Sequence, residues 1–298
     1  MGIGGGGDVV GALAAAGVAA ALGTPAEVGG LTWERRPIDP LPGPRRLDEV
    51  DGAERVHAAA ALAGPDTTGP GGFHFAESRM AGVLGRPVAL IDPTGGPAAI
   101  AGGLVAVASR LDCDLLVLLD VGGDVLAHGG EAGLASPLAD ALLLAAGPLT
   151  EAAGLRTVAV VFGAGCDGEL TPAEVRQRFE EVTFAGGARG ESDPPPAALD
   201  AIETALPHVP TEASAMALRC ARGETGHAAI RGGRRTVELS PLGGRLLWFD
   251  PAVAMASAAR LAELVRDAAS LQEGHDLLTA RGVRTELAYE LDAAASGG

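Results

Sequence analysis

One pattern recurs three times along the chain and constrains its fold more than any other feature. Each instance joins a short apolar run to a turn rich in glycine and aspartate, and a helix-like segment follows. Apolar runs of four to six residues that alternate with helices are typical of parallel strands buried on both faces of a sheet. The three instances are PVALIDPTGG (87–96), DLLVLLDVGGD (114–124) and TVAVVFGAGCDGE (157–169), and the helix-like segments after them cover 98–110, 136–146 and 171–182.

A shortened form of the same pattern opens the chain. Residues 1–8 read MGIGGGGD, and the apolar segment 9–22 is expected to form a helix after this glycine-rich turn. Strands that alternate with helices predict an α/β fold of the three-layer, Rossmann-like type, with a mostly parallel sheet and helices on both faces. Only Gly2 and Ile3 remain for the first strand, so either this strand is very short or the chain starts later than its relatives.

A loop rich in glycine and proline, GGARGESDPPP (186–196), separates two parts of the chain. We expect residues 1–185 to form the α/β ligand-binding core. We expect residues 186–298 to extend the sheet or to form a small lobe packed on the core. A single domain covering 1–298 is the alternative, because 298 residues with 47% hydrophobic residues can bury one large core.

Composition excludes several classes of protein. The formal net charge is −16, and nucleic-acid binding needs a basic face, so we expect no nucleic-acid partner. No stretch reaches about 18 apolar residues without Gly, Pro or a charge, so we expect no membrane partner. The three cysteines have no CxxC spacing, which disfavours a disulfide scaffold and structural zinc and favours the cytoplasm.

The chain contains no lysine, and all of its basic residues are arginine. Schiff-base chemistry on lysine and the lysine of a Walker A loop are therefore excluded. A phosphate or carboxylate of a small-molecule ligand has to be bound by arginine, by backbone amides or through a metal ion.

The turns after the apolar runs form the expected ligand site. In open parallel sheets, ligands bind at the carboxyl ends of the strands, and glycine there lets the backbone approach a ligand closely. A single such turn is ordinary turn chemistry, whereas four turns at one edge indicate a pocket with many free amides and several carboxylates. We expect a nucleotide such as ATP to bind there with Mg²⁺. The cofactor-binding candidates are Gly4, Gly5, Gly6, Gly7, Asp8, Asp92, Thr94, Gly95, Gly96, Gly122, Gly123, Gly165 and Asp167. Gly168 and Glu169 follow Asp167 in the same turn and are further candidates at this edge.

The loop DVGGDVLAHGGEAGLASPLAD (120–140) supplies most of the catalytic candidates. Asp120 and Asp124 are expected to hold Mg²⁺ or to orient the substrate, because carboxylate oxygens are preferred ligands of this ion. Glu131 is a further catalytic candidate, and His128 and Ser136 are candidates for substrate binding. The spacing matches no zinc motif, and solvated loop charges are the structural alternative.

Cys166 supports a separate hypothesis. AGCDG (164–168) follows an apolar run and matches the pattern of a nucleophile elbow. The next helix starts near Thr171 rather than directly after the cysteine, which favours a structural or ligand-lining residue. A Cys166-dependent hydrolase or acyltransferase is nevertheless the second enzymatic alternative, with the oxyanion stabilised by amides of the turn.

The segment LTWERR (31–36) supplies the other candidates for substrate binding, which are Trp33, Glu34 and Arg35. Arg35 is expected to neutralise a phosphate or carboxylate of the ligand. An edge strand with solvated arginines is the structural alternative. Glu34 is the candidate for binding the ribose of NAD, and it keeps an NAD(P)-dependent oxidoreductase as a further alternative.

Several segments of the chain resemble one known family. GIGGGGDVVGA, WERRPIDPLPGPR, FAESRMA, GAGCDGELTPAEV and VELSPLGGRLLWFDP are similar to its characteristic blocks, and LDVGGDVLAHGGEAGLASPLADALLLAA (119–146) is the most specific of them. The family is bacterial and archaeal and is known only as domain of unknown function 1152. The resemblance covers nearly the whole chain and implies one full-length unit without an established activity.

We therefore expect a cytoplasmic small-molecule enzyme that binds a nucleotide or another phosphorylated ligand at the Gly/Asp edge. Group transfer or ligation is favoured over redox chemistry, because no acidic residue ends a convincing second strand. A non-catalytic ligand-binding protein is the alternative from another class, and a homo-oligomer is compatible with the sequence.

Overall fold

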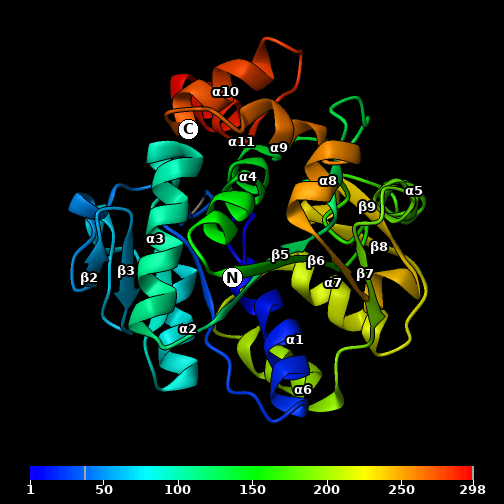
Figure 1. The fold of residues 1–298 in the computed structure, drawn as a ribbon, viewed down its shortest axis with the longest axis horizontal. Coiled ribbons are helices and arrows are strands. Elements are labelled where there is room, and N and C mark those ends of the chain that lie inside the picture. Colours follow the sequence, from blue (N-terminus) through cyan, green and yellow to red (C-terminus); the bar gives the residue numbers. More distant parts are fainter. Residues whose placement is uncertain (37, 297–298) are drawn as a thin grey trace.

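The computed structural model describes residues 1–36 and 38–296, and it has a mixed α/β fold (Figure 1). The strands are β1 (Gly29–Leu31), β2 (Glu54–His57), β3 (Ala60–Ala63), β4 (Val88–Ile91), β5 (Leu115–Val121), β6 (Arg156–Phe162), β7 (Ala188–Ser192), β8 (Gly226–Ile230), β9 (Arg235–Leu239) and β10 (Leu246–Phe249). They form a four-stranded sheet of order β1–β4–β3–β2, a second of order β5–β6–β10–β7, and a separate β8–β9 hairpin.

The first three residues connect the two larger sheets. Gly2 forms a parallel bridge with Leu119 of β5, and the Ile3 amide donates to the Leu119 carbonyl at 3.0 Å. On the other side, the Gly2 amide donates to the Gly29 carbonyl of β1 at 2.8 Å. The first strand is thus very short, and it places the N-terminal glycine turn at the centre of the molecule (Figure 1).

Strand directions are parallel near this centre and antiparallel outside it. β1 pairs with β4, and β5 with β6, in parallel. The outer pairs β2–β3, β3–β4, β6–β10 and β10–β7 are antiparallel. The prediction of a mostly parallel sheet is therefore wrong for the outer strands. One reason is local, because β2 and β3 are joined by two residues, and a parallel connection needs a crossover of a dozen or more.

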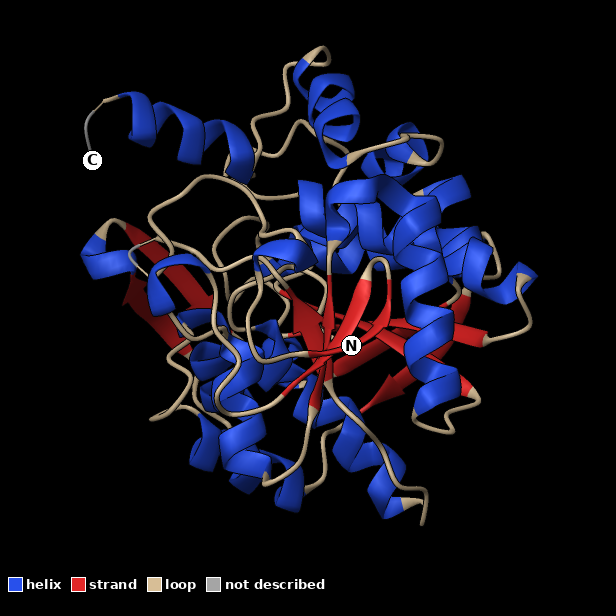
Figure 2. Cartoon of the chain, turned by 90° about the vertical axis from the view of Figure 1, so that its left-hand side faces the viewer, coloured by secondary structure: helices blue, strands red, loops and turns tan. Residues whose placement is uncertain are grey.

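Helices cover both faces of the second sheet (Figure 2). Successive side chains of a strand point to opposite faces. Along β5, Leu118 accordingly packs into a core with α4 and α8, whereas Leu119 and Val121 pack into a core with α1 and α6. The helices are α1 (Asp8–Ala21), α2 (Ala76–Leu84), α3 (Gly96–Arg110), α4 (Leu138–Ala152), α5 (Pro172–Phe184), α6 (Pro196–Ala205), α7 (Glu212–Ala221), α8 (Pro251–Ser257), α9 (Arg260–Val265), α10 (Leu271–Thr279) and α11 (Glu286–Ala295).

The pattern of strand, glycine turn and helix is confirmed at all three predicted places. Helix α3 follows β4, α4 follows β5, and α5 follows β6. The C-terminal part of the chain adds β7 and β10 to the sheet that contains β6, and α8, α9 and α10 pack against α4. Within the described part of the chain, no helix has the length and apolar character needed to cross a membrane.

Candidate functional site

Three carboxyl groups from distant parts of the chain meet beside the N-terminal glycine turn, and they are termed the inner triad. They belong to Asp8 at the start of α1, Asp120 near the end of β5, and Asp140 in the first turn of α4. One oxygen of each group lies within 4.8 Å of the other two. Gly4 packs against the triad so closely that a Cβ there would lie 2.7 Å from Asp8 Oδ2 and 3.1 Å from Asp140 Oδ2.

The three groups differ in their hydrogen bonds. The Gly4 amide donates to Asp8 Oδ2 at 3.0 Å, and the Gly123 amide donates to Asp120 Oδ2 at 2.8 Å. Asp140 is only 3% exposed, and its Oδ1 has no hydrogen-bond partner among the described residues. A buried carboxylate without a partner is costly unless another group neutralises it. The inner triad therefore has the character of an incomplete cation site.

Burial and mutual repulsion raise the pKa values of the inner triad. Burial raises the pKa of Asp8 to about 7. The pKa values of Asp120 and Asp140 lie well above the usual range, first because both groups are buried and second because other carboxylates repel them. A divalent cation among the three groups would favour their charged forms and lower these pKa values.

A second set of three carboxyl groups, termed the outer triad, adjoins the first. Asp124 follows β5, and Asp167 and Glu169 follow β6, with one oxygen of each within 4.8 Å of the other two. Gly122 packs onto Asp167, where a Cβ would lie 2.5 Å from the carboxyl carbon. The pKa of Asp124 is raised well above its usual range first by burial and next by Asp140, so the two triads interact.

Glu169 is held in place by the loop before α4. The amides of Ala135 and Ser136 donate to Glu169 Oε2 at 2.7 and 2.8 Å, and the Ser136 hydroxyl donates to Oε1. Arg231 forms an ion pair with Oε1 at 3.4 Å. Ser136 therefore positions a carboxylate of the outer triad instead of offering a free hydroxyl to a substrate.

A cavity of about 300 Å³ is lined by Glu169 of the outer triad, but by neither Asp124 nor Asp167. The turn after β6 lines one side of this cavity, and the β8–β9 hairpin lines the other. Its lining includes Gly133, Gly165, Gly168, Glu169, Thr171, His227 and Glu238. A second cavity, of about 230 Å³, lies beside Cys220 and is lined by none of the six triad carboxyl groups.

The glycines after β5 and β6 shape the turns instead of presenting free amides. The Gly122 amide donates to the Phe162 carbonyl at 3.1 Å, and the Gly165 amide donates to the Gly122 carbonyl at 2.7 Å. The Gly123 amide is bonded to Asp120. These amides already have acceptors, which disfavours the prediction that Gly122, Gly123 and Gly165 bind a cofactor through them.

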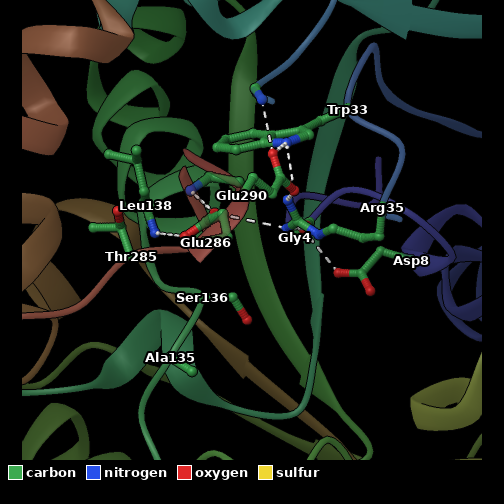
Figure 3. Close-up of polar contacts among 12 residues, drawn as sticks. Gly4, Asp8, Trp33, Arg35, Ala135, Ser136, Leu138, Thr285, Glu286 and Glu290 are labelled. Atoms are coloured by element: carbon green, nitrogen blue, oxygen red, sulfur yellow. Dashed lines mark hydrogen bonds and ion pairs between the residues drawn. The ribbon is translucent and has the colours of Figure 1, made fainter. Parts of the chain in front are cut away.

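Arg35 connects the N-terminal glycine turn to helix α11 (Figure 3). Its Nη2 donates to the Gly4 carbonyl at 2.7 Å, and its guanidinium lies 3.7 Å from Glu286 and 3.6 Å from Glu290. The guanidinium also stacks over Trp33 at 4.7 Å. The side chain is 31% exposed, but Nη1 is buried and lies 3.6 Å from Glu290 Oε1, so this atom faces the glutamates of α11 and not an open ligand site.

Trp33 and Glu34 have structural roles that the sequence did not reveal. Trp33 is fully buried, and its indole nitrogen donates to both Glu290 oxygens at 3.1 and 3.2 Å. Glu34 is buried and accepts a hydrogen bond from the Ala76 amide at the start of α2. Burial raises the pKa of Glu34 to about 7. Neither side chain is free to contact a substrate.

In the turn after β4, Asp92 caps the short 3₁₀ helix Pro93–Gly95 that leads into α3. Asp92 Oδ1 accepts from the Thr94 amide at 2.9 Å and the Thr94 hydroxyl at 2.6 Å, and Oδ2 accepts from the Leu47 amide at 3.0 Å. Asp92 is thus fully paired and belongs to neither triad. The prediction of a cofactor contact at Asp92, Thr94, Gly95 and Gly96 is not supported, because this turn stabilises the start of α3.

His128 and Glu131 form an ion-pair network with α5 instead of joining the triads. His128 Nε2 lies 2.9 Å from Glu181. Glu131 accepts the amides of His128 and Gly129 and pairs with Arg178 at 3.1 Å. These contacts anchor the loop between β5 and α4, and they disfavour the predicted catalytic role of Glu131 and substrate role of His128.

Cys166 is a buried thiol in contact with a second thiol. Its Sγ lies 3.8 Å from Cys220 Sγ, and the side chain is fully buried. The contact with Cys220 and burial both raise the pKa of the Cys166 thiol, which keeps it protonated. Nucleophilic cysteines are accessible and have lowered pKa values, so these features disfavour the hydrolase hypothesis.

Three acidic residues of the site were missed from the sequence. Asp140 lies in the first turn of a helix, where an acidic residue is ordinary. Glu286 and Glu290 lie near the C-terminus, far in sequence from the residues they contact. Glu286 accepts the amides of Leu138 and Ala139 at 3.0 and 2.9 Å and so caps α4 (Figure 3). Their i, i+4 spacing places both glutamates on one helix face, which is the signal that could have paired them.

The comparisons with known proteins identify a family but no activity. The model of a family described as protein of unknown function (DUF1152) matches residues 1–294. This range includes both triads and the two glutamates of α11. No curated protein and no solved structure matches the chain.

Proposed function

The chain belongs to the DUF1152 family, whose function is unknown, and we propose that it is a cation-dependent enzyme that acts on a nucleotide or another phosphorylated ligand. The reaction class that fits the site best is group transfer. The observation that carries the proposal is the buried inner triad, in which Asp140 Oδ1 has no partner within the described chain.

The inner triad has the donor set that a magnesium ion prefers. Asp8, Asp120 and Asp140 offer three carboxylate groups and no nitrogen or sulfur ligand. Mg²⁺ binds oxygen ligands and usually keeps several waters and substrate phosphates in its shell. When bound by these three residues, the ion would neutralise phosphate charge and polarise a phosphoryl oxygen.

The glycine turn before α1 supplies donors for a phosphate. The N-cap residue Gly7 provides no side-chain cap, and Gly5 and Gly6 have φ values of +75° and +56°. The amides of Gly5 and Gly7 meet no acceptor among the described residues. Free amides at a helix N-terminus favour anions. The N-terminus of α4 is unavailable for this role, because Glu286 already caps it.

Two further observations favour group transfer over redox chemistry. Arg35 donates to the Gly4 carbonyl and its side chain is 31% exposed, so its positive charge would lie beside a phosphate held by the glycine turn. Glu34 is committed to the Ala76 amide, so the carboxylate proposed for the ribose of NAD is not available.

Thermal unfolding with candidate ligands tests the proposal, because a ligand that binds the native state raises its melting temperature. ATP, NAD, FAD and CoA are added with and without Mg²⁺ to wild type, to Asp120→Asn, and to the exposed control Asp267→Asn. We expect a nucleotide to stabilise wild type and the control only with Mg²⁺, and to leave Asp120→Asn unchanged. The proposal is contradicted if no phosphorylated ligand raises the melting temperature of wild type. It is also contradicted if the melting temperature of Asp120→Asn rises as much as that of wild type.

A further inference from the structure

We infer that the protein binds two divalent cations, one in the inner triad and a second in the outer triad formed by Asp124, Asp167 and Glu169. This inference rests on the proposed function and extends it, because that function requires only the cation of the inner triad.

Asp124 provides an observation that is independent of the clustering of acidic residues. Asp124 is 6% exposed, and no residue that the structure describes donates a hydrogen bond to its carboxylate oxygens, which unlike Asp140 Oδ1 keep a small contact with solvent. Buried carboxylates are nearly always hydrogen-bonded. One Asp124 oxygen lies within 4.8 Å of a carboxylate oxygen of Asp167 and of Glu169. Its neighbours there are therefore acceptors, not hydrogen-bond donors. A cation is the group that would satisfy this oxygen.

The other two members of the outer triad are fixed by the fold. Asp167 Oδ1 accepts the Glu169 amide at 3.2 Å, and Gly122 packs against its carboxyl group. Glu169 is held by Ala135 and Ser136. Asp167 keeps acceptor capacity for a cation, because its Oδ1 accepts one bond and each carboxylate oxygen has two lone pairs. Each oxygen of Glu169 already has two donors, so Glu169 would contribute negative charge beside the cation rather than a free lone pair.

The balance of charge also calls for more than one cation. The two triads contain six carboxyl groups. Arg231 is the one cationic side chain in the described residues that forms an ion pair with any of them, at 3.4 Å from Glu169. Arg35 pairs instead with Glu286 and Glu290. One divalent ion in the inner triad would leave the three carboxyl groups of the outer triad with Arg231 as their one cationic partner among the described side chains, and these groups repel one another at short range.

The two triads have separate approaches for a ligand. The inner triad lies beside the N-terminal glycine turn, through the contact of Gly4 with Asp8 and Asp140. The outer triad borders the cavity of about 300 Å³ through Glu169. A cation in the outer triad would therefore contact a ligand that enters through this cavity, whereas the inner cation would contact phosphates held by the glycine turn.

Counting bound Mn²⁺ tests the inference directly. Mn²⁺ replaces Mg²⁺ at oxygen sites, and its free form is measured by electron paramagnetic resonance during a titration of cation-free protein. We expect two Mn²⁺ per chain in wild type and in Asp267→Asn. We expect one in Asp167→Asn and one in Asp140→Asn, since each variant keeps the size of the side chain and removes one charge from one triad.

The wild-type count decides the inference even if a variant fails to fold. One Mn²⁺ or none per chain in wild type overturns the inference, and so does a count of two in folded Asp167→Asn. The count is distinguishable from the test of the proposed function. Wild type with one Mn²⁺, lost in Asp140→Asn, together with nucleotide-dependent stabilisation, overturns only the second site. The absence of any nucleotide effect overturns the function, whatever the count.

Discussion

The turns after β4 and β5 have similar sequences, but their aspartates accept different numbers of hydrogen bonds. In the first, Asp92 accepts three hydrogen bonds and caps the short 3₁₀ helix Pro93–Gly95. In the second, Asp120 accepts one bond from Gly123, and Asp124 accepts none from the described residues. The difference shows that similar aspartate–glycine turns can either pair their carboxylates fully or leave acceptors unpaired, and we propose a ligand site only for the second kind.

The residues around each aspartate explain the difference. After β4, Thr94 and the Leu47 amide supply the donors. After β5, two glycines bring no side-chain donor, and the turn after β6 adds further carboxylates. The first turn therefore stabilises the fold, whereas the second brings carboxyl groups together whose repulsion a cation would relieve under our proposal.

The largest expected effect that separates the two turns is on cation affinity. Asp140→Asn removes a ligand of the inner triad, and we expect Mn²⁺ affinity at that site to fall by about 100-fold or more, since even supporting contacts of a metal site contribute up to this much. Isothermal titration calorimetry with cation-free protein measures the change. Asp92→Asn is the matched control and should bind Mn²⁺ as wild type does. Equal affinities in Asp140→Asn and wild type would remove Asp140 from the site.

The second expected effect is on folding stability without a cation. Here the variant at Asp92 should lose stability, and the variant at Asp140 should not. Asp92→Ala leaves three donors without an acceptor, so we expect the free energy of unfolding to fall by about 2 kcal/mol or more. Asp140→Asn removes a charge that is buried and repelled, so we expect cation-free stability to be equal or higher. Urea unfolding in the presence of a chelator measures both values. A larger loss in Asp140→Asn than in Asp92→Ala would contradict the comparison.

The third effect is the dependence of cation-free stability on pH. Burial raises the pKa of Asp8 and Glu34 to about 7 and of Asp167 to about 8, whereas in the unfolded chain these groups titrate near 4. The folded state therefore holds more protons between these values, and its stability falls as the pH rises from 5 to 8. We expect the melting temperature in chelator to fall by several degrees over this range, as measured by scanning calorimetry. A melting temperature that rises with pH would contradict the assigned directions.

The smallest expected effect concerns the thiol pair. Cys166→Ala removes one buried sulfur, which should lower the free energy of unfolding by about 1 kcal/mol through lost packing. Mn²⁺ affinity and the nucleotide-dependent shift in melting temperature should remain within about twofold of wild type, since a core thiol takes no part in binding. Loss of turnover in this variant, with cation binding intact, would restore the nucleophile hypothesis.

The local parts of the fold were predictable, and the long-range parts were not. Each apolar run and the helix after it depend on neighbouring residues, so β4, β5, β6 and their helices were predicted correctly. The antiparallel position of β10 between β6 and β7 depends on a connection that the apolar pattern does not specify. The strand directions beyond the centre were therefore missed.

The site residues that follow strands were predictable from the sequence, and the long-range contacts of the site were not. Asp8, Asp120, Asp124 and Asp167 were found because they follow strands, and parallel strand ends meet at one edge. Asp92 follows the same pattern, and only the position of the Leu47 amide shows that it is already paired. Glu290 contacts Trp33 and Gly43 across more than 240 residues of sequence, and no local pattern reveals such a contact.

The central claim is that a divalent cation binds the carboxyl groups at this edge. Its most direct test is to measure the melting temperature of cation-free protein at pH 8, with and without added Mg²⁺. At 100 times the dissociation constant, a bound cation stabilises the folded state by about 2.7 kcal/mol. We predict a clear rise in the melting temperature of wild type and of Asp92→Asn, and a much smaller rise in Asp140→Asn. An identical melting temperature of wild type with Mg²⁺, with Mn²⁺ and in chelator would contradict the claim.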